Sequence, residues 1–367
     1  MKIAFVANTG WNIYNFRKGL VQHFLSKGDE VLFLVPQDEY VQVVESWGAK
    51  WVETPLDATG NNPLKDAGYL RSLYRAFKKE RPDVVLGYTI KSNIYSCLAS
   101  HYLKIPTICN VSGLGTAFLV KGLMGRIALL LYRLAFRYAG YVFFQNRHDR
   151  DLFISKIKVP ESKIGLLPGS GIDLQEFAQM DYLPKKTFRF LMISRLIVEK
   201  GVNEFAEAAS HFVDNSSVSF TLVGKLDEGH ARTIRKNILD SWIEEKWLDY
   251  LPHTSKVKEL IREHDAVILP SYREGTPRTL LEAAAIGRPL LASRVPGCTE
   301  VVMEGYNGFL FEVQNSKSLV DKLKLFMALS SKERITMANN SRKLVDQKFD
   351  ENLIIDAYDI VIDRIAR

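Results

Sequence analysis

The sequence predicts an α/β protein of two domains, each built on a parallel sheet with helices beside it. Short apolar runs such as Ile3–Ala7 alternate with longer amphipathic segments, as expected of strand–helix units. The 367 residues, 47% of them apolar, suffice for two domains of ordinary size. A glycine-rich passage at 168–173 separates two series of such units, so we predict domains at 1–170 and 171–350.

The first domain should begin with a strand and then alternate between strands and helices. Its expected strands are the apolar runs Ile3–Ala7, Glu30–Val35, Trp51–Thr54, Asp83–Gly87, Pro106–Val111, Tyr141–Gln145 and Ile164–Leu167. Its expected helices are Ile13–Ser26, Asp38–Trp47, Leu64–Arg81, 118–138 and Asp149–Ile157. The opening is Rossmann-like but lacks the full glycine fingerprint, because only Gly10 is present in the first turn.

The second domain repeats this alternation. Its expected strands are Phe188–Ser194, Val218–Val223, Leu248–Leu251 and Ala266–Leu269. Its expected helices are Val202–Phe212, Asp227–Glu245 and Thr279–Ile286, and a last amphipathic helix spans about Glu351–Ile365.

The stretch 268–293 is the most informative part of the chain. It has the pattern strand, turn, helix, turn, strand, and its loop enters the helix at Pro277. The backbone amides near Thr279 and Leu280 then lie at the positive end of the helix, where a diphosphate would bind.

Two acids flank that helix start. Glu274 precedes the helix in the loop, and Glu282 lies about one turn inside it. Paired carboxylates at this spacing can bind the hydroxyls of a sugar and of a ribose. Alternatively, Glu274 is a solvated loop acid and Glu282 only complements the helix dipole.

These acids and their neighbours resemble the signature of the family-4 retaining glycosyltransferases of the GT-B fold. The matching residues are Glu274, Gly275, Pro277, Leu281, Glu282, Ala283, Ala285, Gly287 and Pro289. Upstream, Ile193–Leu196 and Glu199–Gly201 resemble the family's strand-end Arg and Lys pair. The resemblance covers nearly the whole chain. It implies two Rossmann-like domains facing across a deep cleft, with the C-terminal helix, 351–367, returning to the first domain.

The resemblance also implies the donor site. Arg195, Lys200 and Glu274 would be catalytic, with the two cations stabilising the leaving diphosphate without a metal. The implied donor-binding residues are Gly10, Arg195, Lys200, Val257, Glu274, Gly275, Thr276, Pro277, Thr279, Leu280 and Glu282. For Gly10 the alternative is a plain strand–helix turn. No cofactor is expected besides the UDP-sugar substrate.

An acid-x-acid sequence, Asp149-Arg150-Asp151, superficially matches the metal motif of other glycosyltransferases. We interpret these acids as the first turn of a helix, where they complement its dipole. No metal site is therefore expected.

Two motifs of the first domain, 88–93 and 110–115, resemble the subgroup that builds bacterial capsule, O-antigen and glycoprotein glycans on polyprenyl diphosphate. The motif VPQDEY at 35–40 points toward N-acetylgalactosaminyltransferases. The implied acceptor-binding residues are Lys91, Asn93, Ser112 and Gly113, with Lys91 receiving the acceptor's diphosphate. Many family members carry a His at the position of Ser112.

Charge is distributed unevenly between the halves. Residues 1–170 carry a net charge of +9, from 22 Lys and Arg against 13 Asp and Glu, whereas 171–367 carry −2. The first half should therefore meet something anionic, and we expect this to be a membrane surface and no nucleic acid. In segment 118–138, Arg126, Arg133 and Arg137 share one helical face, as in an interfacial helix. A core helix between layers is the alternative.

The three cysteines, Cys97, Cys109 and Cys298, lie in apolar segments without paired or metal-like spacing, which favours a reducing cytoplasm. The N-terminal apolar run is too short for a signal peptide, and no stretch of about 20 residues is free of charge. We therefore expect a cytoplasmic protein, peripheral on the inner face of the membrane.

The predicted function is transfer of a hexose or N-acetylhexosamine, with GalNAc first, from a UDP-sugar to a polyprenyl-diphosphate-linked saccharide. Nothing in the sequence marks a nucleophile, so we expect same-face attack with retention. Three alternatives stay open: a UDP-sugar epimerase or hydrolase of similar fold, a transferase with a soluble acceptor, and a non-catalytic membrane scaffold.

Overall fold

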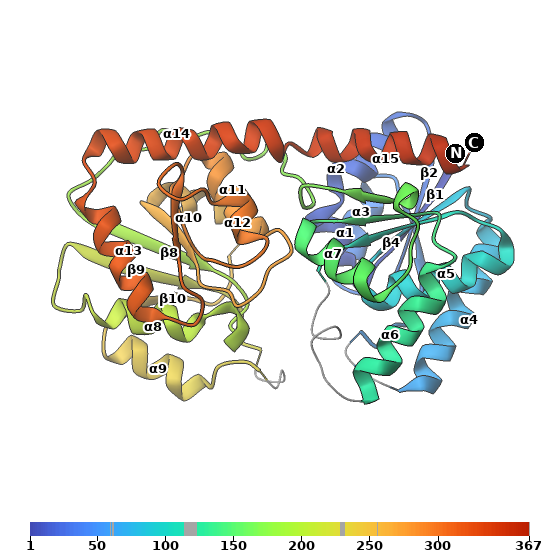
Figure 1. The fold of residues 1–367 in the computed structure, drawn as a ribbon, viewed down its shortest axis with the longest axis horizontal. Helices are drawn as coiled ribbons and strands as arrows, with labels where there is room; N and C mark the ends of the chain where they lie inside the picture. Colours follow the sequence, from blue (N-terminus) through green and yellow to red (C-terminus); the bar gives the residue numbers. More distant parts are fainter. Residues whose placement is uncertain (59, 61, 114–122, 228–231, 255, 367) are drawn as a thin grey trace. The chain divides into compact units, whose positions relative to one another are not determined.

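The computed structural model describes residues 1–58, 60, 62–113, 123–227, 232–254 and 256–366. It divides into two compact units, shown in Figure 1: unit 1 is Met1–Gly171 with Glu351–Arg367, and unit 2 is Ile172–Asp350. Each unit has its own parallel sheet with helices on both faces, which confirms the predicted α/β class.

The described part of unit 1 has a seven-stranded sheet of order β3-β2-β1-β4-β5-β6-β7, with every pair parallel. Its strands are β1 (Lys2–Val6), β2 (Glu30–Val35), β3 (Lys50–Glu53), β4 (Val84–Tyr88), β5 (Thr107–Val111), β6 (Tyr141–Phe144) and β7 (Ile164–Leu166). The central strands are buried along most of their length because helices cover both faces.

The helices of unit 1 form two layers. One layer packs on the first core cluster and contains α4 (Pro63–Glu80), α5 (Ile90–Leu103), α6 (Leu123–Phe136) and α7 (Arg147–Lys156). The other contains α1 (Gly10–Phe16), α2 (Lys18–Ser26), α3 (Val41–Ser46) and the C-terminal α15 (Glu351–Ala366). Ile354, Tyr358 and Ile362 bury α15 in this second layer, so the last helix completes the unit in which the chain begins.

One predicted helix of unit 1 is broken. The sequence predicts a single helix over Ile13–Ser26, but the structure has α1 and α2 with Arg17 between them. Arg17 leaves helical geometry at φ −131° and ψ 7°, and its guanidinium carbon lies 4.0 Å from the centroid of the Tyr88 ring. A tertiary contact with β4 thus overrides the continuous local helical pattern.

The described part of unit 2 has a six-stranded parallel sheet of order β10-β9-β8-β11-β12-β13. The strands are β8 (Phe188–Ile193), β9 (Val218–Val223), β10 (Asp249–Leu251), β11 (Ala266–Leu269), β12 (Leu290–Ser293) and β13 (Gly308–Phe311). The helices are α8 (Val202–Ser210), α9 (Lys236–Glu244), α10 (Val257–Glu263), α11 (Arg278–Ile286), α12 (Cys298–Val301), α13 (Ser316–Ala328) and α14 (Ser331–Lys348).

The helix predicted over Asp227–Glu245 is shorter in the structure, where α9 starts at Lys236. Before it, Thr233 forms an antiparallel bridge with Ile197, and the Ile234 amide donates to the Leu196 carbonyl at 3.0 Å. These residues therefore pair with the loop after β8 and cannot continue a helix.

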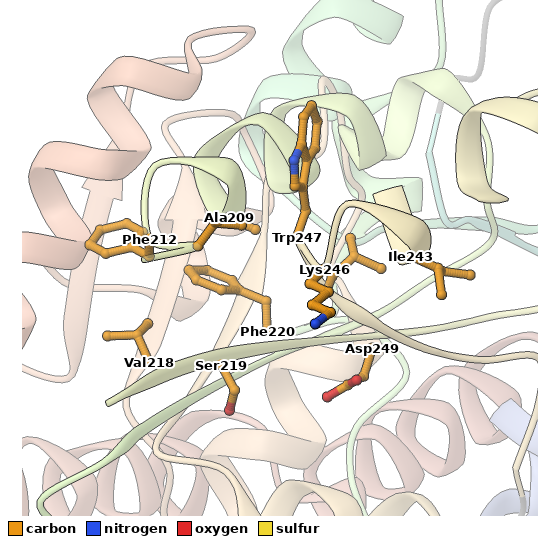
Figure 2. Close-up of a pocket in the computed structure, with 11 residues that line it drawn as sticks. Ala209, Phe212, Val218, Ser219, Phe220, Ile243, Lys246, Trp247 and Asp249 are labelled. Atoms are coloured by element: carbon orange, nitrogen blue, oxygen red, sulfur yellow. The ribbon is translucent and has the colours of Figure 1, made fainter. Parts of the chain in front are cut away.

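A small pocket of about 160 Å³ opens at the amino ends of β9 and β10 (Figure 2). Phe212, Phe220 and Trp247 supply most of its aromatic lining, and Lys246 and Asp249 supply charge. Ligands of open α/β sheets bind at the carboxyl ends of the strands. This pocket therefore lies at the opposite edge of the sheet from the expected site.

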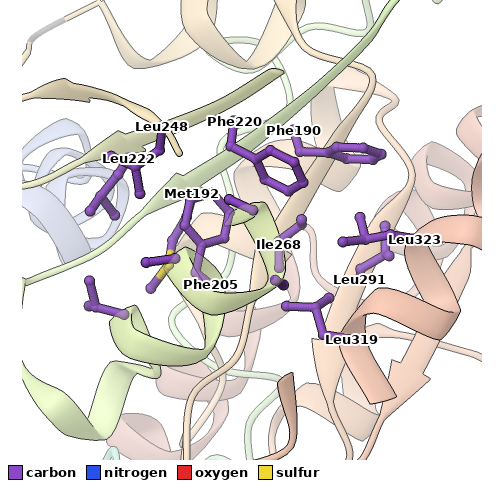
Figure 3. Packing of buried hydrophobic residues seen from close by; sticks show 14 of the residues in the cluster. Phe190, Met192, Phe205, Phe220, Leu222, Leu248, Ile268, Leu291, Leu319 and Leu323 are labelled. Carbon is purple, nitrogen blue, oxygen red and sulfur yellow. The ribbon is translucent and has the colours of Figure 1, made fainter. Parts of the chain in front are cut away.

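The core of unit 2 fixes the sheet against its helices. Figure 3 shows Phe190 and Phe220 from adjacent strands near Phe205 of α8. The ring centroids of Phe190 and Phe220 lie 5.3 Å apart. On the other face, α11 is buried through Leu280, Leu281 and its run of alanines. The small alanine side chains let α11 lie close to the sheet.

The strand order defines a switch point in each sheet. In unit 1, β1 lies between β2 and β4, and in unit 2, β8 lies between β9 and β11. The connections therefore leave the first strand in opposite directions, and the loops after the two neighbouring strands separate at their carboxyl ends. These two edges are therefore the candidate positions for a functional site.

Candidate functional site

At the switch point of unit 2, the loop after β8 lies against the loop after β11. The Tyr272 amide donates to the Glu199 carbonyl at 2.9 Å, and the Thr279 hydroxyl donates to the Ile193 carbonyl at 3.3 Å. The Tyr272 hydroxyl also donates to Glu204 Oε1 at 2.7 Å, which ties the second loop to α8. Two sequence motifs about 75 residues apart thus form one site.

Lys200 and Glu274 form an ion pair across these loops. Their side chains are only 21% and 11% exposed, so the pair is largely shielded from water. Lys200 ends a short 3-10 turn, Val198–Lys200, and Gly201 follows at φ 73°. A Cβ at Gly201 would overlap the Pro270 carbonyl, so glycine permits the loops to approach.

Arg195 lies at the carboxyl end of β8 and is exposed. Its carbonyl accepts from the Ile197 amide at 2.9 Å and from the Ser194 hydroxyl at 3.1 Å, which fixes its backbone. Within the described residues, the guanidinium has no carboxylate partner. It can therefore bind an anion with two parallel N–H groups.

Helix α11 begins at Arg278 without a side-chain cap. The Leu280 amide donates to the Pro277 carbonyl at 3.1 Å, so the amide that the sequence analysis assigned to a diphosphate already has a partner. Leu280 itself is buried and Thr279 is half-buried. Of the two amides expected at this helix start, that of Thr279 is the better placed for an anion.

Glu282 pairs with Arg278 one helical turn earlier, at 2.9 Å between Oε1 and Nε. Burial raises the pKa of Glu282 above its usual range, and the neighbouring Arg278 guanidinium opposes this shift. Arg278 was absent from the predicted site. Its spacing of four residues from Glu282 on a helix was the available signal.

Gly297 lies against the backbone of the loop that carries Glu274. It precedes α12 at φ 84°, and a Cβ there would overlap the carbonyl oxygen of Gly275. The buried Cys298 thiol follows, and burial raises its pKa, with the Glu274 carboxylate adding to the shift.

Val257, which the sequence predicts as a donor-binding residue, begins α10 and is half-buried.

Lys91 in unit 1 does not form the open phosphate site that the sequence analysis expects. Its ammonium donates to Asp66 Oδ1 at 2.7 Å and to the carbonyls of Asp57 and Gly60 at 2.9 and 2.6 Å. An ammonium has three N–H groups, and all three are used. Lys91 therefore anchors the loop before α4.

Asn93 also faces the interior, because its side chain donates to the Asn110 carbonyl at 2.9 Å and only 2% of the residue is exposed. Its expected role in acceptor binding stays a prediction. Ser112 is exposed and Gly113 half-buried, just after β5.

Gly10 is buried at the start of α1, and the Asp38 carboxylate lies against it. Asp38 Oδ2 accepts from the Trp11 amide at 3.1 Å. A donor phosphate at this position would meet the Asp38 carboxylate, and the expected role of Gly10 in donor binding stays a prediction.

The expected interfacial segment corresponds to α6. Residues 118–122 and the side chain of Arg126 lie outside the described part of the structure. Arg133 and Arg137 are exposed; the first donates to the Lys156 carbonyl at 2.9 Å. None of the helices in the described residues combines the length and apolarity that a membrane span requires.

The acids Asp149 and Asp151 belong to the first half of α7, which starts after Asn146. The Asp149 amide donates to the Asn146 side chain at 2.8 Å, and Asp151 pairs with Arg150. Among the described residues, no cluster of three or more His, Cys, Asp or Glu is arranged to hold a metal ion.

The chain is similar along its length to known proteins. A family model described as "Glycosyl transferases group 1" matches residues 175–344, and one described as "Glycosyl transferase 4-like domain" matches residues 16–169. An N,N'-diacetylbacillosaminyl-diphospho-undecaprenol alpha-1,3-N-acetylgalactosaminyltransferase of Campylobacter jejuni is 30% identical, with 100% of both chains covered. A UDP-Gal:alpha-D-GlcNAc-diphosphoundecaprenol alpha-1,3-galactosyltransferase of Escherichia coli is 26% identical over 77% of this chain and 78% of its own.

Solved structures share the fold. A glycosyltransferase of Rickettsia africae has a TM-score of 0.81 at 17% identity and covers 100% of this chain and 98% of its own. The Anabaena protein HepE, solved with UDP and glucose, has a TM-score of 0.80 at 18% identity, with 99% and 100% covered. Neighbours of this kind are GT-B glycosyltransferases, which confirms the predicted fold class.

The geometry around Gly297 yields a stability prediction. Gly297→Ala should destabilise the protein more than Gly305→Ala, although both glycines have positive φ. The backbone strain, about 1–3 kcal/mol, is common to both variants. Only Gly297→Ala adds an overlap with the Gly275 carbonyl, for about 1–3 kcal/mol more, because a Cβ at Gly305 meets nothing within 4 Å. Urea unfolding followed by circular dichroism measures the difference, and equal losses would contradict the close approach.

Proposed function

We propose that this chain, which belongs to the group 1 glycosyl transferases, transfers a sugar from a UDP-sugar to a polyprenyl-diphosphate-linked saccharide. GalNAc is the first candidate for the transferred sugar, and the configuration at its anomeric carbon would be retained. The reaction would form part of bacterial glycan assembly. The relatives from Campylobacter jejuni and Escherichia coli support this acceptor class, because both are named for diphosphoundecaprenol substrates.

The proposal rests on the Lys200–Glu274 pair together with the exposed Arg195 at the end of β8. When a sugar leaves UDP, negative charge grows on the departing diphosphate. Two cations already in position stabilise that charge, because they need not reorganise as the bond breaks. Lys200 acts as a point charge and Arg195 as a fork for two oxygens.

Glu274 has two tasks in this mechanism. One oxygen pairs with Lys200 and fixes the ammonium beside the diphosphate. The carboxylate keeps further lone pairs that can accept a hydroxyl of the donor sugar, since an ionised carboxylate offers about four acceptor positions. The loop from Gly275 to Pro277 would border the same sugar.

Retention follows from same-face attack. The acceptor hydroxyl attacks the anomeric carbon from the side that the diphosphate leaves, and its proton passes to the departing phosphate oxygen. The new glycosidic bond replaces the sugar–phosphate bond, and UDP is released. Arg195 and Lys200 hold the phosphate in reach of that proton.

Glu282 would bind the ribose hydroxyls of UDP. The Arg278 guanidinium opposes the rise in the pKa of Glu282 that burial causes, and the ionised carboxylate is the form that accepts hydroxyl hydrogen bonds through both oxygens. Val257, at the start of α10, would border the nucleobase.

Unit 1 would receive the acceptor at the membrane surface. Exposed apolar side chains recur along one side of α6 at Ile127, Leu130 and Leu134, next to the exposed Arg133 and Arg137. This combination is typical of helices that lie in the lipid interface, where each cation contributes about 1 kcal/mol on an anionic leaflet. The cytoplasmic leaflet is the expected location. Because Lys91 is engaged, it would meet the acceptor's diphosphate only after leaving Asp66 and the carbonyls of Asp57 and Gly60.

Transfer of labelled sugar from a panel of UDP-sugars to short-chain polyprenyl-diphosphate-linked saccharides tests the proposal. We expect an α-linked product from one donor, with equal yield in the presence of a chelator. Glu274→Gln should lower kcat/KM by about 100-fold or more, because the donor sugar and the Lys200 ammonium both lose the carboxylate that they contact. Glu244→Gln, on the exposed face of α9, serves as the matched control and should keep full activity.

Other products would identify the alternatives. Free sugar or an epimer without labelled lipid would identify a hydrolase or epimerase. Label on a water-soluble acceptor instead of lipid would identify a soluble acceptor. A covalent sugar–enzyme adduct, or a β-linked product, would contradict same-face attack.

The raised pKa of Glu282 predicts a pH dependence of donor binding. Burial lifts this pKa above 4.5, so acidification protonates Glu282 at a higher pH than an ordinary glutamate. Affinity for UDP should therefore fall by up to about tenfold per unit as the pH drops below that pKa, and stay level above it. Calorimetric titration of UDP with the wild type and with Glu282→Gln isolates this group, because the titration of UDP itself is common to both. Parallel pH profiles would refute the assignment.

A further inference from the structure

A carboxylate fills the anion position at the switch point of unit 1. Asp38, after β2, accepts from the Trp11 amide through Oδ2 at 3.1 Å and from the Tyr40 amide through Oδ1 at 3.0 Å. Gly10 makes room for it, because a Cβ there would overlap Oδ1. Glu39, next in the chain, is exposed. This part of the edge therefore repels phosphate and favours an uncharged group that donates hydrogen bonds.

Two of the residues whose backbone amides hold this carboxylate, Trp11 and Tyr40, carry aromatic side chains. Trp11 and Tyr14 are 43% and 38% exposed, and their spacing of three residues places them on the same side of α1. The Tyr14 ring centroid lies 5.0 Å from that of Tyr40, and it lies 5.9 Å from that of Trp47, on which the Tyr14 ring stacks. Phe16 meets Trp11 edge-on at 5.2 Å. The rings are thus held in place while part of their surface faces water.

We propose that the surface formed by Trp11, Tyr14 and Tyr40, with Asp38 and Glu39 beside it, binds a pyranose ring of the acceptor saccharide. The apolar C–H face of a pyranose matches an aromatic face, and its hydroxyls donate to carboxylates. Each Asp38 oxygen has a lone pair left after its bond to an amide. This inference rests on the proposed glycosyl transfer and names its acceptor subsite.

The position in the sheet favours a saccharide over another occupant. In the order β2-β1-β4, the loop carrying Asp38 and the start of α1 with Trp11 adjoin the loop that begins α5. That loop is where the acceptor is expected in unit 1. The two carboxylates exclude the acceptor's diphosphate from the aromatic surface itself, so the sugar portion is the part that fits there.

Steady-state kinetics with Trp11→Ala tests the inference. We expect the acceptor KM to rise about tenfold or more, with the donor KM and kcat within about twofold of wild type, because only acceptor contacts are lost. Trp11→Phe keeps a ring and should recover most of the acceptor affinity. Tyr102→Ala is the matched control, since Tyr102 is an exposed ring of the same unit on α5 and is 76% exposed.

A binding measurement separates this inference from the proposed function. The free saccharide, without lipid or diphosphate, should change the tryptophan fluorescence of the wild type saturably, and Trp11→Ala should lose that response. This experiment needs no turnover, so it stands even if glycosyl transfer is not observed. An unchanged acceptor KM in Trp11→Ala, with active wild type, would overturn the inference and leave the transferase intact. A change in sedimentation with unchanged KM would assign the rings to a contact between copies and also overturn it.

Discussion

The approach of two loops at the carboxyl ends of β8 and β11 is the constraint on which the candidate site depends. It brings Lys200 and Glu274 into one ion pair, although 73 residues lie between them in the chain. Gly201 and Gly297 permit this approach, because a side chain at either position would overlap the backbone of the loop after β11. The parallel pairing of β8 and β11 places the ends of the two strands, from which these loops start, side by side.

The fold was predictable because its information is local. Buried strands appear as short apolar runs, and the break after a helix is marked by residues such as Gly287. The site of unit 2 was also accessible, since its acids and cations belong to two compact motifs. Its missed member, Arg278, pairs with Glu282, four residues on. The predicted ends of helices were wrong where a tertiary contact intervenes. Arg17, whose guanidinium lies over the Tyr88 ring, is an example.

In unit 1 the contacts that the sequence did not predict are those whose partner is distant in the chain. Lys91 has the composition of a phosphate ligand, but Asp66 and two loop carbonyls use its N–H groups. Gly10 occupies the position of a phosphate-binding glycine, but Asp38 from the next strand lies against it. Neither contact has a signature in the local sequence. A charged residue or a glycine at a strand end thus indicates the ligand-binding edge of the sheet. Which ligand fits there depends on contacts with residues distant in the sequence.

The most direct test of the proposed mechanism is the affinity for UDP of a variant that lacks the Lys200 ammonium. Calorimetry should show binding by the wild type without added metal and a loss of about tenfold or more in Lys200→Met. Lys236→Met, which removes an exposed lysine paired with Asp240 in the same unit, should bind as the wild type does. Equal affinities in all three proteins would contradict the assignment of Lys200 to the donor diphosphate and, with it, the proposed mechanism.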